Sequence, residues 1–245
     1  MRRHVWLALA FSRVAAARPG FWCAFGDKLL AHRAAEARPD FYAETPRPLS
    51  GREWFQIHWE PTVRCASDER VGRAGDGGKW VCDPMCTLAQ HNCTVMSVGS
   101  NNDFSFETAL DPRHCSVHTF DHTVASPTPP ASVTFHSLGV ASAPAGSLRT
   151  LAQLYEATGW TQDIDILKMD CEGCEYGVFS HQETLEFLAK RVRQLLLEVH
   201  YTNAEATARL AQNLWNAGFR TFSKEPNIQY SDGSCVEYAL LKVAS

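Results

Sequence analysis

The 245-residue sequence lacks two features that define large classes of proteins: long apolar runs and clustered positive charge. No apolar run approaches the roughly 20 residues that span a bilayer, which argues against stable membrane insertion. The formal net charge is -4 and no dense block of lysine and arginine occurs. Because phosphate binding needs a clustered positive field, a nucleic-acid partner is disfavoured and a small molecule is expected instead.

Cysteine, by contrast, is abundant. Nine cysteines are many for a cytosolic protein and favour the secretory pathway or the extracellular space, with the cytoplasm as the alternative. The odd number leaves at least one thiol outside any intramolecular disulfide. Neither Cys82-x3-Cys86 nor Cys171-x2-Cys174 is completed by a second pair at zinc-finger spacing, which favours disulfides or buried thiols over a zinc site.

The first 17 residues allow two interpretations. A basic start, a short apolar run over residues 5–11 and alanines at 15–17 resemble a secretory signal peptide with its cleavage site. Arg13 interrupts the end of that run, so an amphipathic cytosolic segment fits equally well. Residues 1–61 show no clear hydrophobic period and contain several prolines, and we therefore expect an irregular N-terminal extension followed by one domain over residues 62–245.

From residue 93 onward, short apolar runs alternate with helix-like segments, which is typical of an α/β fold with a mostly parallel sheet. We expect strands at residues 93–99, 115–121, 133–140, 164–170 and 192–200. Ser147 is expected to cap a helix that ends at Gly159, and Thr202 to open a capping box with Glu205. Strand-like runs at 219–222 and 235–243, separated by turn residues, predict a C-terminal antiparallel hairpin.

The ends of these strands carry the candidate site, because ligands of an open parallel sheet bind beyond the carboxyl ends of its strands. Asp121 follows Gly99 by about 20 residues, where a carboxylate can accept hydrogen bonds from ribose hydroxyls. Gly99 permits close approach of the backbone, and Asn101 tolerates a positive φ. The further glycines of a dinucleotide fingerprint are missing, and Asp103 would repel a pyrophosphate, which disfavours NAD. A cofactor with ribose but no phosphate, such as S-adenosylmethionine, fits better.

The segment DILKMDCEGCEYGVF, which begins at Asp165, resembles the hallmark of FkbM-type methyltransferases, a strand followed by D-x-E-G-x-E. Preceding it, HWEPTVRC, GDGGKWVCDP and VMSVGSNNDFSFE are similar to the methyltransferase-like protein 24 group. The resemblance extends from about residue 54 to the C-terminus. It implies that residues 62–245 form a class I methyltransferase domain, with a Rossmann-like sheet that binds S-adenosylmethionine.

The cofactor site expected at the strand ends comprises Ser97, Gly99, Ser100, Asn101, Asp121, Gly139, Asp170 and Glu172. Under the resemblance, Asp121 corresponds to the ribose-binding acid, and Asp170 with Glu172 to the fourth-strand motif. The first motif departs from the usual pattern, because it offers Ser97 and a single glycine where most methyltransferases have an acid and two or three glycines. A methyltransferase-fold binding module without catalysis is therefore the alternative function.

For catalysis we expect methyl transfer to a small-molecule or glycan-like acceptor through a hydroxyl oxygen. His200 is the candidate general base, and Glu198, on the same face of the strand, could orient it or bind the acceptor. Asp170 completes the predicted catalytic set, although a purely structural His200 is equally compatible with the sequence. Together with Glu172, these side chains also have the ligand types of a divalent-metal site, an alternative that we disfavour. Lys79 or Trp80 is expected to close over the cofactor.

Overall fold

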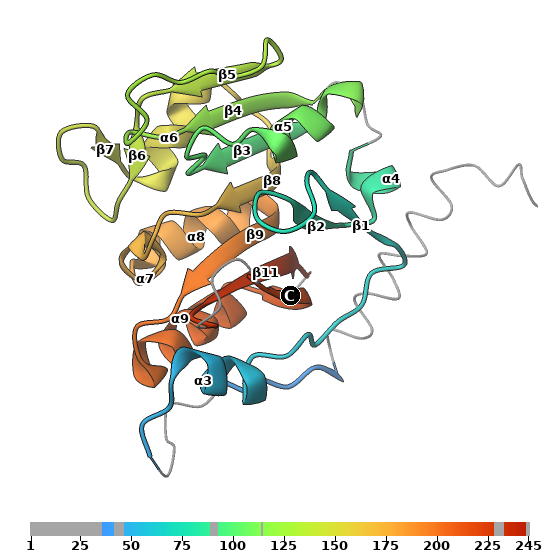
Figure 1. Cartoon of the computed structure of the whole chain (residues 1–245), viewed down its shortest axis with the longest axis vertical. Helices are drawn as coiled ribbons and strands as arrows, with labels where there is room; N and C mark the ends of the chain where they lie inside the picture. Colours follow the sequence, from blue (N-terminus) through green and yellow to red (C-terminus); the bar gives the residue numbers. More distant parts are fainter. Residues whose placement is uncertain (1–35, 42–46, 89–92, 114, 228–232, 244–245) are drawn as a thin grey trace, which may run out of the picture.

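The computed structural model describes residues 36–41, 47–88, 93–113, 115–227 and 233–243, so that the predicted signal peptide lies outside the described residues. Its central sheet is built from β3 (Thr94–Val98), β4 (Ser116–Phe120), β5 (Val133–His136), β8 (Ile164–Met169), β9 (Val192–His200), β10 (Phe219–Pro226) and β11 (Cys235–Lys242). The order across the sheet is β10-β11-β9-β8-β3-β4-β5 (Figure 1).

β11 is antiparallel to both of its neighbours, whereas the pairs among β9, β8, β3, β4 and β5 are parallel. The predicted Rossmann-like α/β sheet, mostly parallel with a C-terminal antiparallel hairpin, is thus confirmed. Its central strands are apolar because both faces are covered. In β9, for example, Leu195 and Leu197 join one apolar core and the intervening Leu196 joins the other.

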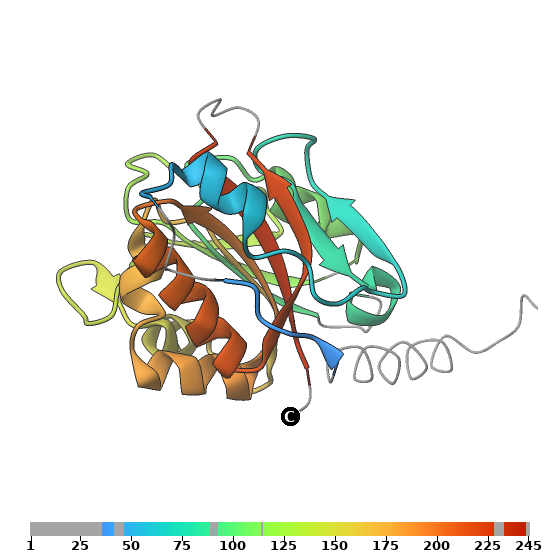
Figure 2. The same ribbon diagram turned by 90° about the horizontal axis from the view of Figure 1, so that it is seen from below.

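Helices cover one face of the sheet. They are α6 (Leu151–Thr158), α7 (Cys174–Val178), α8 (Gln182–Arg191) and α9 (Ala204–Asn216). The opposite face is covered by the hairpin of β1 (Asp68–Val71) and β2 (Lys79–Cys82), with the short helices α4 (Pro84–Thr87), α5 (Ser105–Ala109) and η2 (Asp111–Arg113). Figure 2 shows the orange helices and the cyan hairpin on different sides of the sheet. No helix in the described ranges has the length and apolar character needed to cross a membrane.

Two predicted helix starts were wrong. Thr150, rather than Ser147, caps α6, because Thr150 and Gln153 form a complete reciprocal capping box. The residues before Thr150 instead form β7 (Leu148–Arg149), which pairs with β6 (Gly139–Val140). The single strand predicted over 133–140 is therefore wrong: it is divided into β5 and β6, which belong to different sheets. α9 begins one residue later than expected, because the Asn203 side chain accepts the N–H of Ala206.

The segment expected to be irregular contains the helix α3 (Gly51–Ile57). Ser50 and Glu53 form its capping box, a local signal that the prolines of this region obscured. Trp54 and Phe55 are buried in the same core as α9. Trp59 stacks on Tyr238 of β11, with the ring centroids 4.1 Å apart. The division of the chain at residue 61 remains a prediction.

Three disulfides link described cysteines: Cys65–Cys82, Cys93–Cys115 and Cys171–Cys174. The first fastens the segment before β1 to the end of β2, and the second joins the starts of β3 and β4. The third spans only the turn between β8 and α7, where the sequence had offered a zinc half-site as its weaker alternative. Cys171 and Cys174 are bonded to each other, as the disulfide prediction requires.

Candidate active site

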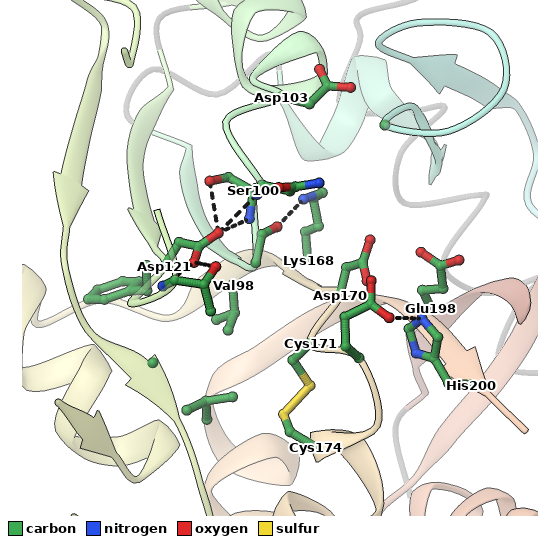
Figure 3. A pocket seen from close by; sticks show the side chains of 18 of the residues that line it. Val98, Ser100, Asp103, Asp121, Lys168, Asp170, Cys171, Cys174, Glu198 and His200 are labelled. Atoms are coloured by element: carbon green, nitrogen blue, oxygen red, sulfur yellow. Dashed lines mark hydrogen bonds and ion pairs between the residues drawn. A yellow bond between two sulfur atoms is a disulfide. The ribbon is translucent and has the colours of Figure 1, made fainter. Parts of the chain in front are cut away.

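The carboxyl ends of β3, β4, β8 and β9 meet at a cavity of about 670 Å³ (Figure 3). The predicted site residues that line it are Gly99, Ser100, Asn101, Asp121, Gly139, Asp170, Glu172, Glu198 and His200. Asp121 and Ser100 lie toward one end, whereas Asp170, Glu198 and His200 gather at the other (Figure 3). Ser97 does not line the cavity, because its side chain is fully buried inside the sheet.

Gly99 is required where β3 passes the end of β8. Its φ of +80° lies in the left-handed region, and a Cβ atom added there would stand 1.6 Å from the carbonyl oxygen of Asp170. The surrounding backbone is held by hydrogen bonds from the Gly99 N–H to Phe120 and from the Asp170 N–H to Val98, each 2.9 Å long. The single glycine of the first motif thus sets how closely the two strand ends approach.

Asp121 holds the loop that follows Gly99. Its Oδ2 accepts the backbone N–H groups of Ser100 and Asn101 at 2.8 and 2.9 Å, and its Oδ1 accepts the N–H and hydroxyl of Thr123. Burial alone would raise the pKa of Asp121, but these hydrogen bonds lower it to about 2. The carboxylate is ionised and shapes the loop, and its predicted contact with ribose remains a prediction.

Lys168, near the carboxyl end of β8, supports the same loop from inside the sheet. Its ammonium group donates to the carbonyl of Gly99 at 2.9 Å and lies 3.8 Å from the carboxylate of Glu107 on α5. Glu107 also accepts the hydroxyl of Ser97. Both charged side chains are buried. Lys168 lies inside an apolar strand and therefore needs a partner, which Glu107 supplies from α5.

Acidic groups dominate the other end of the cavity. Glu198 is 3% exposed, and burial together with the nearby Glu237 and Asp170 raises its pKa to about 9. For Asp170, burial opposes ionisation, but hydrogen bonding with Glu198 and the charges of Lys79 and Lys168 lower the pKa. At neutral pH, Glu198 therefore holds a proton and Asp170 is ionised.

The stretch from Asp76 to Trp80, which contains Lys79 and Trp80 and was expected to close over the cofactor, lies only partly at the cavity. Asp76 and Gly77 line the cavity. Lys79 does not line the cavity. It forms an ion pair with Glu237, and its Nζ is 4.0 Å from Glu198 Oε2. The indole N–H of Trp80 instead donates to Glu225 on β10, outside the set of cavity-lining residues. The sequence offered no signal for the pairing of Lys79 with β11.

His200, at the end of β9, lies between two carboxylates. Its Nε2 is 3.2 Å from Glu172 Oε2, and its Nδ1 is 3.4 Å from Oε1 of the fully buried Glu175 on α7. Burial opposes the charged imidazole, but Glu175, Glu198 and Glu172 together raise the pKa of His200 to about 9. At neutral pH the imidazole is protonated, which disfavours the predicted general base in the ligand-free protein.

The chain matches a known protein family in sequence and is similar in fold to several solved structures. A family model described as a methyltransferase domain matches residues 20–242. No curated protein matches the chain at a significant level. Among solved structures, the 1,6-didemethyltoxoflavin-N1-methyltransferase of Burkholderia thailandensis, with bound 1,6-didemethyltoxoflavin and S-adenosylhomocysteine, is 15% identical. The alignment covers 63% of this chain and 72% of that chain, with a TM-score of 0.39.

Two further solved structures are similar to this chain at comparably low sequence identity. The N-methyltransferase NodS of Bradyrhizobium japonicum is 10% identical over 64% of this chain and 90% of its own, with a TM-score of 0.40. The fibrillarin pre-rRNA processing protein of Methanococcus jannaschii is 8% identical over 74% and 84%, with a TM-score of 0.42. Because the family model covers most of its length, the chain belongs to the methyltransferase domain family.

Proposed function

We propose that the protein methylates a hydroxyl oxygen of a small-molecule or glycan-like acceptor. The observation that carries this proposal is the state of Asp170 at the acidic end of the cavity. Its Oδ1 is buried and has no hydrogen-bond partner among the described residues, and the carboxylate is ionised. Such a group can accept the proton of an acceptor hydroxyl. Glu198 and His200, both protonated at neutral pH, can donate hydrogen bonds to the oxygens of a polyhydroxylated acceptor.

The residues present fit the cofactor. The positive φ of Gly99 lets the backbone approach a ligand closely, and the carboxylates of Asp121 and Asp170 line opposite parts of the cavity. When bound, S-adenosylmethionine supplies an electrophilic methyl group on a sulfonium cation. The cavity residues then have to hold the acceptor oxygen in line with that methyl group and receive the proton of the acceptor hydroxyl. The carboxylates of Asp170 and Glu172, which line the cavity, also match the positive charge of the cofactor.

Two finer assignments accompany this proposal. The DILKMDCEGCEYGVF segment supports placement among FkbM-type methyltransferases, near the methyltransferase-like protein 24 group. The three disulfides support folding in the secretory pathway, where thiols are oxidised. Localisation of the tagged full-length chain would test the second assignment, and a purely cytosolic signal would contradict it.

Asp170→Asn tests the chemistry. We expect this variant to lower kcat for hydroxyl acceptors by about 100-fold or more, because the amide cannot take a proton, while S-adenosylhomocysteine still binds. The measurement is a methyl-transfer screen over sugars and small alcohols, with titration calorimetry of S-adenosylhomocysteine on the same samples. Asp163→Asn is a matched control, because Asp163 precedes the other end of β8. Full activity of Asp170→Asn, or transfer to amines alone, would contradict the proposal.

Asp121→Ala tests the cofactor site. Micromolar binding of S-adenosylhomocysteine, equivalent to about 8 kcal/mol, is expected for the native protein and should be lost in the variant. An analogue without ribose hydroxyls separates the two roles of Asp121. If the carboxylate binds ribose, the substitution weakens S-adenosylhomocysteine much more than the analogue. If it only shapes the loop, both ligands weaken by the same factor.

Asp111→Ala, at an exposed residue of η2, is the control for that titration. This variant should bind S-adenosylhomocysteine like the native protein. Absence of binding by well-folded native protein would count against the proposed reaction and favour a non-catalytic binding module.

A further inference from the structure

The acidic end of the cavity also has the composition and the spacing of a cation site. We propose that Asp170, Glu172 and His200 bind one divalent metal ion, with Mn²⁺ or Zn²⁺ as the ions best suited to carboxylate and imidazole ligands. One ligand atom from each residue lies within 4.8 Å of the other two. Glu172 Oε2 and His200 Nε2 are 3.2 Å apart. Two ligands bound to the same ion at about 2.1 Å, at right angles, are separated by roughly 3 Å.

Unsatisfied polar atoms support this site independently of the spacing. Asp170 Oδ1 and His200 Nδ1 are both buried, and neither has a hydrogen-bond partner among the described residues. A buried polar atom without a partner costs free energy comparable to a lost hydrogen bond, so that such atoms often mark a place where an ion or ligand binds. Here Asp170 Oδ1 is the atom that marks the place of the ion, whereas His200 Nδ1 lies on the far side of the ring, toward Glu175.

The surroundings of His200 orient its ring for metal binding. Glu175 is fully buried, and its Oε1 accepts the backbone N–H of His200 at 2.9 Å. The same oxygen lies 3.4 Å from the Nδ1 atom, close to hydrogen-bonding distance. Metal-bound histidines commonly donate their second ring N–H to a carboxylate, which fixes the tautomer and directs the other nitrogen at the ion. An ion bound to Nε2 would leave the proton on Nδ1, facing Glu175.

Charge balance at this end of the cavity also favours a cation. The carboxylates of Asp170 and Glu172 line it, and the lysines close to Asp170 already have carboxylate partners of their own: Lys79 pairs with Glu237 and Lys168 with Glu107. A divalent ion would therefore compensate carboxylates that the protein itself does not fully neutralise. This inference rests on the proposed function and gives Asp170 and His200 another role in it. As ligands of the ion, they would not act as proton acceptor and hydrogen-bond donor; an acceptor hydroxyl bound to the ion would have a lowered pKa and would release its proton to water.

The loop between β8 and α7 presents Glu172 to the site. Glu172 has a φ of +55°, between Asp170 and the glycine at position 173, and the Cys171–Cys174 disulfide closes the turn. Its side chain is 83% exposed, yet the carboxylate reaches the imidazole of His200. Because Glu172 contributes little to packing, its substitution can test the ion without disturbing the fold.

The test uses the full-length protein after treatment with a chelator. MnCl₂ is titrated into the protein, and free Mn²⁺ is followed by electron paramagnetic resonance. We expect one saturable site in the native protein and at least tenfold weaker binding in Glu172→Gln. Glu175→Gln, a change at a positioning residue, should also weaken binding by about 10-fold or more. Glu156→Gln, on the exposed surface of α6, is the matched control and should bind Mn²⁺ like the native protein.

Absence of saturable Mn²⁺ binding by the native protein, or equal affinity of native and Glu172→Gln protein, would overturn the proposed site. S-adenosylhomocysteine is titrated into the same chelator-treated samples. Retained S-adenosylhomocysteine binding without Mn²⁺ binding overturns the cation site alone. Loss of S-adenosylhomocysteine binding in folded native protein bears instead on the methyltransferase function. Circular dichroism of each variant ensures that only folded protein is compared.

Discussion

Gly99→Ala is expected to abolish S-adenosylhomocysteine binding and to lower the free energy of unfolding by about 3 to 5 kcal/mol, the range of severe packing defects. The new Cβ would stand 1.6 Å from the carbonyl oxygen of Asp170, so that β3 and β8 must separate. Because the displaced backbone lies beside the cavity, the cofactor loop would move as well. Urea unfolding and titration calorimetry measure the two effects.

Gly159→Ala is the matched control for this substitution. Gly159 has a similar φ of +73°, but a Cβ there would meet nothing within 4 Å. Its cost is therefore limited to the left-handed conformation, about 1 to 2 kcal/mol, and cofactor binding should be unchanged. Equal losses of stability in the two variants, together with intact cofactor binding in Gly99→Ala, would show that the close approach to Asp170 does not matter.

Lys168→Met should destabilise the protein by about 3 to 5 kcal/mol, because it leaves Glu107 buried without its cation. It also removes the hydrogen bond to the carbonyl of Gly99, so that cofactor affinity should fall at the same time. Urea unfolding reports the first effect and titration of S-adenosylhomocysteine the second. Lys190→Met, on the exposed surface of α8, should change neither quantity.

The double variant Lys168→Met/Glu107→Gln distinguishes the buried pair from general damage to the core. The neutral amide introduced in place of the Glu107 carboxylate no longer requires a cation, so the double variant should be more stable than the sum of the two single losses predicts. Strictly additive losses would mean that the ion pair at 3.8 Å contributes no coupling.

Local patterns accounted for most of the sheet. The apolar runs ending at Gly99, Asp121 and His200 predicted β3, β4 and β9, because strands buried on both faces need apolar side chains throughout. Asp121, Asp170, Glu198 and His200 could be assigned to one cavity, because parallel strands place their carboxyl ends at one edge. Helix starts were less predictable. A choice between neighbouring caps, as between Ser147 and Thr150, depends on small differences in local hydrogen bonding.

The charge state of the candidate site depends on contacts between distant parts of the chain. Lys79 pairs with Glu237 across 158 residues, and Lys168 of β8 pairs with Glu107 of α5. These contacts, with burial, leave Asp170 ionised and Glu198 and His200 protonated, which moves the proposed proton acceptor from His200 to Asp170.

The sequence by itself determined the positions of the main strands along the chain, their mostly parallel arrangement and the edge of the sheet that carries the site, because hydrophobic period and turn residues act over a few positions. Only the tertiary structure decided which carboxylates share a proton, why Gly99 must be glycine, and which side chains can hold a cation. Those properties depend on distances between segments far apart in the chain, and on the low dielectric that their packing creates.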